Sequence, residues 1–348
     1  MPAAVAIVGT GDWARNGLAP ALADLPGATL AACVSVDDEQ AARFAADFAV
    51  PHRFSTFEAL LTDGPPIDLA VIATPDDHHP AAVRGAIAAG LAVYCEKPVA
   101  NTARVADDLA SEIASASRPA TVGFSFRYSD AVQRLRHDFA TGMLGTAWLL
   151  ELYEHNAQFH PRVGRPMTWK QDPAHAGGGA LFEYGAHILD LGAWLLGPTR
   201  DVAASFARVH PGARLDDIAT VQLRYADGVL GTAVASWVLE GGFPGIRVVL
   251  HGSIGTAEAL LDDARTTGDV YRRLAADGTV LEEVNFPALD HHGYARRHFA
   301  DLFATLRGDT PRYAQTLPTF ADGAHVQHVL EAALAATQQR VPVSGPGR

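Results

Sequence analysis

Two short segments hold the residues whose types and spacing best suit catalysis, and they lie far apart in the chain. Glu96, Lys97 and Pro98 directly follow an apolar run that is typical of a buried strand. Ligands of open parallel sheets bind at the carboxyl ends of the strands, so Lys97 is a candidate for contact with a bound molecule. A surface lysine at a strand end is the alternative. His187 follows Glu183 by four residues, behind three glycines, and a helix would place both side chains on one face. Because the ordinary pKa of histidine is about 6.5, His187 is suited to exchange a proton near neutral pH. A structural pair on a solvated helix has the same spacing.

A glycine-rich turn near the start of the chain predicts a dinucleotide site. The apolar residues 5–8 suit a buried strand, and Gly9 and Gly11 follow it, which allows a tight turn and a close approach of the backbone to a phosphate. A helix that begins near Asp12 and Trp13 would direct its free N–H groups and its dipole at a pyrophosphate. Such turns also join strands to helices without any ligand. The helical spacing of leucines 18, 22 and 25 favours the cofactor site.

The end of the second predicted strand bears on the choice of coenzyme. NADP requires a cation for its 2′-phosphate, but Val36 is apolar, and Asp37 and Asp38 follow it. These carboxylates would repel a phosphate and accept hydrogen bonds from ribose hydroxyls. Ser35 favours neither coenzyme, and Arg43 could still reach a phosphate. The sequence therefore predicts NAD, with NADP as the alternative.

The elements that must position these residues begin with an alternation of strands and helices. This alternation predicts parallel strands with right-handed crossovers, a doubly wound sheet of the Rossmann type. Ser55 and Glu58 have the spacing of a capping box, and Thr102 is the predicted cap of a later helix. The predicted strands are 5–8, 29–34, 68–73, 91–95 and 120–122, and the predicted helices are 39–48, 81–89 and 103–116.

The pattern changes near residue 123, where apolar or alternating strands begin to be separated by polar loops. Asp227 and Gly228 are a hairpin turn signal between two of these strands. We therefore expect an NAD(P)-binding Rossmann domain over 1–122 and a substrate-binding and oligomerisation α/β domain over 123–348, with a large, mostly antiparallel open sheet. Its predicted strands are 147–153, 219–225, 229–238, 247–251, 259–261 and 280–286, and the predicted helices are 131–139, 180–196, 294–306 and 320–336.

The bulk composition is that of a soluble cytoplasmic enzyme. The chain of 348 residues is long enough for about two domains. Its net charge of −12, with no basic run, argues against binding to nucleic acid or to an anionic membrane surface. No apolar run is long enough to span a bilayer, and the early first strand leaves no room for a signal peptide. Cys33 and Cys95 end apolar runs, which indicates buried, reduced thiols.

Four segments together make a family resemblance specific. GTGDWA follows the first strand, Ala73, Thr74 and Pro75 precede His79, and Glu96 begins the sequence EKP. The fourth segment is GGGALFEYGAHILD at 177–190. In order and spacing the chain is identified as a member of the Gfo/Idh/MocA oxidoreductases. The resemblance covers nearly the whole length and implies a Rossmann domain, a C-terminal domain whose sheet also makes oligomer contacts, and NAD or NADP.

The resemblance also implies roles for single residues. Lys97 would reach the reacting hydroxyl and the nicotinamide ribose and would stabilise a developing alkoxide, while Glu96 would position the cofactor. His187 would carry the hydroxyl proton. Glu183 stands where the family has an aspartate, and its extra methylene leaves its contact open. The residues implied to bind the cofactor are Gly9, Gly11, Asp12, Trp13, Ser35, Val36, Asp37, Thr74, Pro75, His79, Glu96 and Lys97.

The substrate residues follow from the zones that the family directs at the nicotinamide or the substrate. Tyr153, His155 and Asn156 end the first strand of the second domain, and Trp169 and Lys170 precede the glycine triplet. With Lys97, Glu183 and His187, these are the candidate substrate-binding residues. Polar and aromatic side chains suit a sugar or polyol, whose hydroxyls need hydrogen bonds and whose ring faces stack.

The predicted function is hydride transfer between a nicotinamide and a secondary hydroxyl or ketone of a sugar, inositol or related polyol. Two alternatives stay open: a redox-neutral enzyme with tightly held NAD that cleaves or epimerises glycosides, and a non-catalytic sugar sensor. The segment 76–79 holds two aspartates and two histidines, but adjacent residues rarely point at one ion, so no metal is predicted. Because strands 229–238 and 247–251 are apolar on both faces, we expect a homodimer or homotetramer.

Overall fold

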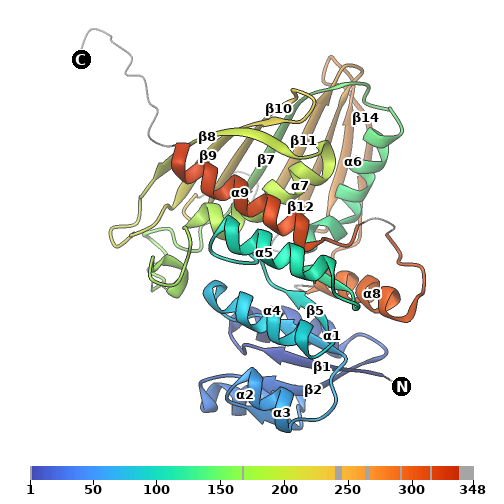
Figure 1. Ribbon diagram of the computed structural model, residues 1–348. Coiled ribbons are helices and arrows are strands. Elements are labelled where there is room, and N and C mark those ends of the chain that lie inside the picture. Colours follow the sequence, from blue (N-terminus) through green and yellow to red (C-terminus); the bar gives the residue numbers. More distant parts are fainter. Residues whose placement is uncertain are drawn as a thin grey trace.

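The computed structural model describes residues 2–166, 168–239, 245–262, 267–290, 292–313 and 316–336. Two β-sheets organise these residues (Figure 1). The N-terminal sheet is parallel, with the strand order β3-β2-β1-β4-β5-β6. Its strands are β1 (Ala3–Val8), β2 (Ala28–Val34), β3 (His52–Phe54), β4 (Leu69–Ile72), β5 (Ala92–Cys95) and β6 (Ala120–Val122). The order reverses between β1 and β4, which is the switch point at which such sheets bind ligands.

Short helices connect the parallel strands and begin at side-chain caps. Asp37 and Thr102 accept backbone N–H groups at the starts of α2 and α5. The cap of α3 is Thr56, which accepts from the N–H of Ala59, so the capping box predicted for Ser55 and Glu58 is wrong. The helices are α1 (Ala19–Ala23), α2 (Asp38–Phe48), α3 (Phe57–Asp63), α4 (His79–Ala88) and α5 (Ala103–Ala114). A π-helical turn at Ala14–Leu18 precedes α1.

The second sheet has the strand order β14-β13-β12-β11-β7-β10-β9-β8. Its neighbours are antiparallel except for β7 and β10, which run parallel. The predicted fold class, a Rossmann sheet joined to a mostly antiparallel sheet, is confirmed. The strands are β7 (Ala147–His155), β8 (Thr199–Ala207), β9 (Ile218–Tyr225), β10 (Leu230–Ser236), β11 (Gly245–Gly252), β12 (Thr256–Asp262), β13 (Val270–Leu274) and β14 (Val280–Asn285).

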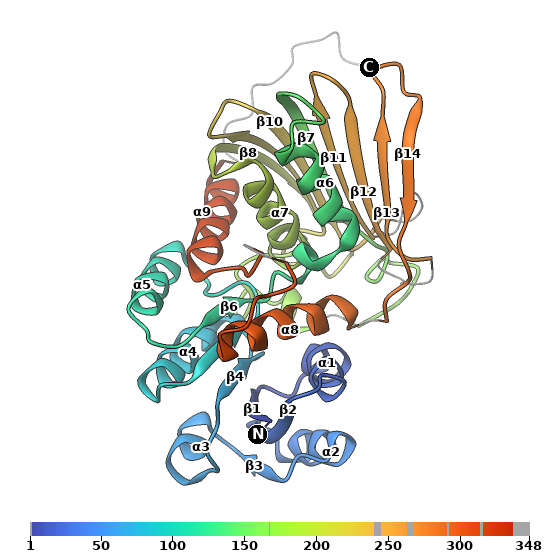
Figure 2. The ribbon, with the colours of Figure 1, turned by 90° about the vertical axis from the view of Figure 1, so that its right-hand side faces the viewer.

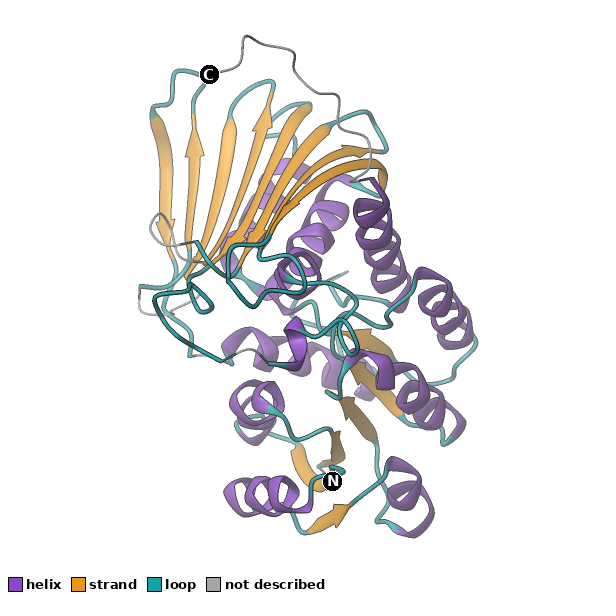
Figure 3. Cartoon of the chain, turned by 90° about the vertical axis from the view of Figure 1, so that its left-hand side faces the viewer, coloured by secondary structure: helices purple, strands orange, loops and turns teal. Residues whose placement is uncertain are grey.

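Helices cover one face of the second sheet, as Figure 2 shows for α6, α7 and α9, while Figure 3 shows the other face without helices. The helices are α6 (Asp130–Ala140), α7 (Ala186–Leu196), α8 (Gly293–Arg307) and α9 (Phe320–Ala336). Helix α9 also contacts α5 and β6, and α8 contacts α1, so the last two helices join the second sheet to the first. No helix within the described ranges is both long enough and apolar enough to cross a membrane.

Both cysteines are buried and free, at the ends of β2 and β5. Burial raises the pKa of the Cys33 thiol to about 11, and burial also raises the pKa of Cys95 well above its ordinary value. Neither thiol is therefore ionised near neutral pH.

Candidate active site

The glycine turn brings the ends of β1 and β4 into close contact. Gly9 has a φ of +98°, a backbone conformation that favours glycine. A Cβ atom on Gly9 would lie 2.5 Å from the carbonyl oxygen of Ala73, whereas one on Gly11 would meet nothing within 4 Å. The hydroxyl oxygen of Thr74, beside this contact, is buried without a hydrogen-bond partner among the described residues. A narrow glycine turn and an unsatisfied hydroxyl at the switch point fit a dinucleotide, which would supply the missing partner.

Trp13 and Glu96 connect the glycine turn to the end of β5. The indole N–H of Trp13 donates to Oε1 of Glu96 over 2.8 Å, and the hydroxyl of Tyr94 donates to the same oxygen over 3.0 Å. A side chain at Gly17 would overlap the Trp13 ring, so this glycine makes room for the indole. Burial raises the pKa of Glu96, while Lys97 and the two donors act against that shift. The carboxylate of Glu96 is therefore fixed in place beside the indole of Trp13.

The turn between β2 and α2 carries the residues expected at the adenosine ribose. Val36 is 94% exposed, and Oδ1 of Asp37 accepts from the N–H of Gln40 over 2.9 Å. The side chain of Gln40 accepts from Thr10 over 3.0 Å and from Ser35 over 3.4 Å. This network ties the turn to the glycine loop. Sequence reasoning missed Thr10 and Gln40, because their contact depends on the pairing of β1 with β2.

His79 lies behind the cofactor loops. Its Nδ1 lies 2.8 Å from the carbonyl oxygen of Pro98 and its Nε2 lies 2.9 Å from that of Thr74. The side chain is fully buried, and burial lowers its pKa to about 4, so the ring is neutral near neutral pH. His79 thus lies between the Thr74–Pro75 loop and the Lys97–Pro98 loop, and the single N–H of the neutral ring can donate to one of the two carbonyls.

Lys97 and Glu183 bring the two halves of the site together. The Lys97 ammonium donates to the backbone carbonyl of Glu183 over 2.8 Å and lies 3.2 Å from Oε2 of its carboxylate. Its side chain is only 8% exposed. Burial lowers the pKa of Lys97, but the charges of Glu183, Glu96 and other carboxylates outweigh burial, so the net direction is upward. Lys97 is therefore a buried, charged ammonium at the carboxyl end of β5.

Glu183 contacts lysines rather than the histidine four residues later. Its Oε1 is bound by the ammonium of Lys170. Burial raises the pKa of Glu183, but the charges of Lys170 and Lys97 outweigh burial, and the pKa falls well below its ordinary value. Glu183 lies in a π-helical turn, Leu181–Gly185, and His187 lies in the first turn of α7. The pair expected on one helix face has no hydrogen bond in the structure, so Glu183 is an anion held by two cations.

His187 packs in an aromatic pocket beside Lys97. Its ring centroid lies 4.5 Å from that of Phe126 and 6.4 Å from that of Phe124. Its Nδ1 is buried without a hydrogen-bond partner among the described residues. Burial, followed by the nearby charge of Lys97, lowers the pKa of His187 well below its ordinary value. The imidazole is therefore neutral and able to accept a proton.

The four remaining substrate candidates do not lie together: two are on the second sheet, and two are in loops that follow β7. Tyr153 and His155 lie on the open face of the second sheet with Glu151, to which the Tyr153 hydroxyl donates over 3.3 Å. Because side chains alternate along a strand, these two are directed away from the helix-covered face. Glu154, between them, lies on that covered face, is buried, and its charge acts on Lys97. Sequence reasoning missed Glu154 because it selected the end of the strand and not its face.

Asn156 and Trp169 lie in loops that follow β7. The side-chain amide of Asn156 donates to the hydroxyl of Tyr184 over 2.9 Å, which joins this loop to the π-helical turn of Glu183. Trp169 begins a short 3-10 turn, Trp169–Gln171, and its side chain lies outside what the structure describes. The turn matters because it also carries Lys170.

A small cavity lies beside Glu183. It is lined by Asp76, Lys170, Ala176, Gly178, Phe182 and Glu183. Asp76 is 8% exposed and begins the 3-10 turn Asp76–His78 after β4. Burial raises the pKa of Asp76 to about 7, against the opposing charge of Lys97. A carboxyl group with such a pKa changes its charge in the physiological range.

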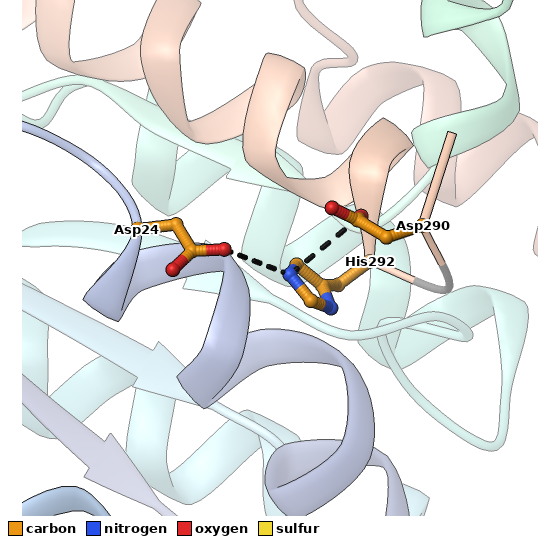
Figure 4. Close-up of side chains that lie close together, drawn as sticks. All are labelled: Asp24, Asp290 and His292. Carbon is orange, nitrogen blue, oxygen red and sulfur yellow. Dashed lines mark hydrogen bonds and ion pairs between the residues drawn. The ribbon is translucent and has the colours of Figure 1, made fainter. Parts of the chain in front are cut away.

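One further cluster of ligand-like side chains lies away from this site, where α1 meets the start of α8 (Figure 4). Nε2 of His292 lies 3.0 Å from Asp24 and 3.6 Å from Asp290. The guanidinium of Arg296 lies 3.2 Å from Asp24 and 2.8 Å from Asp290. Arg296 thus already supplies a positive charge to both carboxylates, and the cluster is an ion-pair network between the two helices.

A glycine turn at the switch point, a buried charged lysine and a neutral histidine are together typical of a dinucleotide-dependent oxidoreductase. The chain belongs to the Gfo/Idh/MocA family. Residues 3–124 match the family's model for the oxidoreductase family with an NAD-binding Rossmann fold, and residues 132–258 match that for the GFO/IDH/MocA C-terminal domain. The protein is therefore an NAD-binding oxidoreductase of this family.

Similar proteins include named sugar and diol dehydrogenases. The chain is 27% identical over 260 residues to a D-apiose dehydrogenase from Paraburkholderia graminis, a match over 74% of this chain and 67% of that protein. It is 29% identical over 200 residues to trans-1,2-dihydrobenzene-1,2-diol dehydrogenase from Bos taurus, over 58% of this chain and 57% of that one. Levoglucosan dehydrogenase, in complex with NADH and levoglucosan, shares the fold with a TM-score of 0.84 at 22% identity, over 97% of both chains.

Proposed function

We propose that the protein is an NAD-dependent dehydrogenase that oxidises a secondary hydroxyl of a sugar, inositol or related polyol. One observation carries the proposal: a charged ammonium from the Rossmann sheet, Lys97, lies beside a neutral imidazole from the second half of the chain, His187. An alcohol oxidation needs both a base for the hydroxyl proton and a cation for the developing alkoxide. The names of the similar dehydrogenases support a sugar or diol as the substrate.

In this mechanism, bound NAD supplies the hydride acceptor. A ring nitrogen of His187 accepts the proton of the substrate hydroxyl. The Lys97 ammonium stabilises the negative charge that develops on the same oxygen, and Glu183 holds Lys97 in place through its carbonyl and its carboxylate. In reverse, the imidazolium returns the proton to the new alkoxide.

The same proposal assigns the coenzyme contacts to the Rossmann half, residues 1–122, and the substrate to the half over 123–348. Gly9, Gly11, Asp12 and Trp13 would meet the pyrophosphate, while Ser35, Val36 and Asp37 would meet the adenosine ribose. Thr74, Pro75 and Glu96 would face the nicotinamide half. His79, with both ring nitrogens at backbone carbonyls, would act by holding the Thr74–Pro75 loop. Each group of residues ends a strand beside the switch point.

The test is the formation of NADH by the purified enzyme from a panel of D-apiose, levoglucosan, myo-inositol and glycerol. Replacement of Lys97 by Met or of His187 by Ala is expected to lower kcat at least ~100-fold with the best substrate, because each removes a charge stabiliser or a proton acceptor. NAD affinity should change little for His187→Ala. Near-wild-type turnover in either folded variant contradicts the mechanism. Release of a rearranged product without net NADH would instead support the redox-neutral alternative.

We further propose that the open face of the second sheet joins two or more copies of the chain. Leu149, Leu230 and Val234 lie on this face, and Leu230 is 51% exposed. Apolar side chains on a broad sheet face without helices favour association. A homodimer or homotetramer with closed symmetry would cover them.

A further inference from the structure

One buried carboxylate holds the start of the π-helical turn that carries Glu183. Asp216 lies just before β9, and its Oδ1 accepts the N–H of Gly179 over 2.8 Å, while its Oδ2 accepts that of Leu181 over 2.9 Å. The backbone carbonyl of the same aspartate accepts the N–H of Ala180 over 2.9 Å. The first N–H groups of a helix need acceptors from outside the helix. Here a single residue supplies them to three consecutive N–H groups.

The close approach of Asp216 requires glycine at position 179. A Cβ atom on Gly179 would overlap the carbonyl oxygen of Asp216 and would lie 2.8 Å from its Oδ1. Cβ atoms on Gly177 and Gly178 would instead overlap the ring of Phe182. The glycine triplet therefore lets the start of the turn pack closely on Asp216 and Phe182.

A continuous line of hydrogen bonds runs from Asp216 to Lys97. The carbonyl oxygen of Gly179 accepts the N–H of Glu183 over 3.0 Å. The carbonyl oxygen of Glu183 in turn accepts from the Lys97 ammonium over 2.8 Å, and the Glu183 carboxylate lies 3.2 Å from the same ammonium. A shift in the start of the turn would therefore move both groups that hold Lys97.

We propose that Asp216 is a positioning residue for the reaction: it fixes the start of the π-helical turn so that Glu183 holds the Lys97 ammonium in place. The reaction that it serves rests on the proposed function. Asp216 acts through the backbone of the turn, because its bonds to residues 179–181 all end on backbone N–H groups. A displacement of ~1 Å at a reacting group can lower a rate ~100-fold, so the position of this turn affects turnover directly.

Asp217 offers a matched control, because it is the next residue and is also a buried carboxylate with three hydrogen bonds. Its Oδ2 accepts the N–H groups of Val209 and His210 over 2.6 and 2.8 Å, and its Oδ1 accepts the indole N–H of Trp237 over 2.7 Å. These bonds hold the loop after β8 and the residue after β10. Asp217→Asn should therefore destabilise the fold about as much as Asp216→Asn without moving the turn before α7.

The first readout is kinetic. Asp216→Asn removes the charge and one of the two side-chain acceptors, and Gly179→Ala pushes the turn away from Asp216. The φ of Gly179 lies outside the left-handed region, so alanine acts there through its overlap alone. Both variants should lower kcat with the best substrate at least ~10-fold and leave the KM for NAD within ~2-fold, because the Rossmann half is unchanged. Asp217→Asn should keep kcat within ~2-fold, and urea unfolding compares the stability of the two asparagine variants.

The second readout is the titration of Lys97, which needs no turnover. Lys97 and Lys170 are the two lysines of the chain, so isotopically labelled lysine gives two side-chain signals in NMR, and Lys170→Met assigns them. Burial lowers the pKa of Lys97, and the charge of Glu183 is the largest of those that outweigh burial. The other carboxylates that act on this ammonium are those of Glu96, Asp76 and Glu154.

Displacement of Glu183 lets burial act with less opposition, so the Lys97 signal should titrate at a lower pH in Asp216→Asn and in Gly179→Ala. In Asp217→Asn it should titrate as in the wild type. A residue with a purely structural role would lower stability without moving this titration. If Asp216→Asn does not fold, Gly179→Ala keeps the aspartate and still tests the contact.

Either readout unchanged in both Asp216→Asn and Gly179→Ala would overturn the positioning role. An equal effect of Asp217→Asn on kcat and on the Lys97 titration would overturn it too, because any loss of stability would then have the same result. Failure of the proposed function looks different: no polyol yields NADH with any of the proteins, while the Lys97 titration still moves in the two variants.

Discussion

At the scale of single residues, the candidate site holds a buried carboxyl group that destabilises the folded protein when it is ionised. Asp76 shows this most clearly, because it is nearly buried and receives no hydrogen bond from the described residues. Burial raises its pKa from 3.8 to about 7 in the folded protein. A carboxyl group with a raised folded-state pKa stabilises the fold when protonated, and this contribution is lost as the pH rises through about 7. Strain of this kind is common where binding groups are held in advance for a ligand.

We therefore predict that Asp76→Asn stabilises the enzyme without coenzyme or substrate. Each unit of difference between the folded-state and unfolded-state pKa of Asp76 corresponds to about 1.4 kcal/mol of stability. Relaxation of the structure around Asp76 makes the gain in stability smaller than the full pKa difference implies. The free energy of unfolding should rise by ~1–3 kcal/mol near pH ~8, and by less near pH ~5, where Asp76 is already protonated. Urea unfolding at both pH values measures this. Asp77→Asn, on the neighbouring residue, is the control and should give no comparable gain. A loss of stability in Asp76→Asn at the higher pH would be inconsistent with a buried, unpaired carboxyl.

The residues of the candidate site could be predicted only where a local sequence pattern indicated them. Lys97 follows a buried strand and His187 follows a glycine triplet, so their segments stood out in the sequence. The contact of Glu183 with Lys170 could not be predicted, because a 3-10 turn and a π-helical turn meet only in the folded chain. Tyr153 was selected from the right strand, but the alternation of side chains directs it to the open face.

At the scale of elements, the turn between β2 and α2 has two tasks. Asp37 caps α2 through one carboxylate oxygen, which leaves the other oxygen for a ribose hydroxyl. The capping bond also fixes the acidic group at the end of β2, where we propose that the adenosine ribose binds. Val36, beside it, is almost fully exposed and offers no positive charge.

This turn predicts that NAD binds at least ~5-fold more tightly than NADP, since a phosphate beside a carboxylate is repelled. Val36→Arg should reduce the difference in affinity between NAD and NADP, because its guanidinium can bind the 2′-phosphate. Asp37 would still cap α2 in this variant. Val280→Arg, an exposed valine on β14 in the other sheet, is the matched control. Titration calorimetry with both coenzymes decides the matter. Tighter binding of NADP by the wild type would mean that a cation such as Arg43 reaches the phosphate.

Long elements with strong periodicity were predicted closely, and α9 has the predicted range of 320–336. The predictions missed β3, β8 and β13. Two of these lie at sheet edges, β3 and β8, and their half-exposed side chains have no dense apolar run. Strand β13 is short and carries two arginines. The π-helical turn at Leu181–Gly185 could not be predicted either. A single turn of π-helix has no sequence pattern that distinguishes it from an α-helix.

At the scale of the whole molecule, the site depends on how the two sheets are joined. Helix α9 contacts both α5 and β8, and the buried guanidinium of Arg127 joins the segment after β6 to Asp190 on α7 over 2.5 Å. Arg296 and His292 tie α8 to Asp24 at the end of α1. These contacts keep Lys97, from the first sheet, near His187 of α7. They also leave the open face of the second sheet uncovered in a single chain (Figure 3).

That uncovered face predicts a closed homo-oligomer. Val234 pairs with Tyr153 of β7 and Thr220 of β9, so it lies well inside the face and not at an edge. A buried glutamate there would be left without a partner. Light scattering at micromolar concentration should give a dimer or tetramer for the wild type and a shift toward monomer for Val234→Glu. Leu61→Glu, on an exposed leucine of α3, should leave the assembly unchanged. A wild-type mass of 36.8 kDa, that of one chain, would refute assembly through this face. A Val234→Glu oligomer as stable as the wild type would place the interface on another surface.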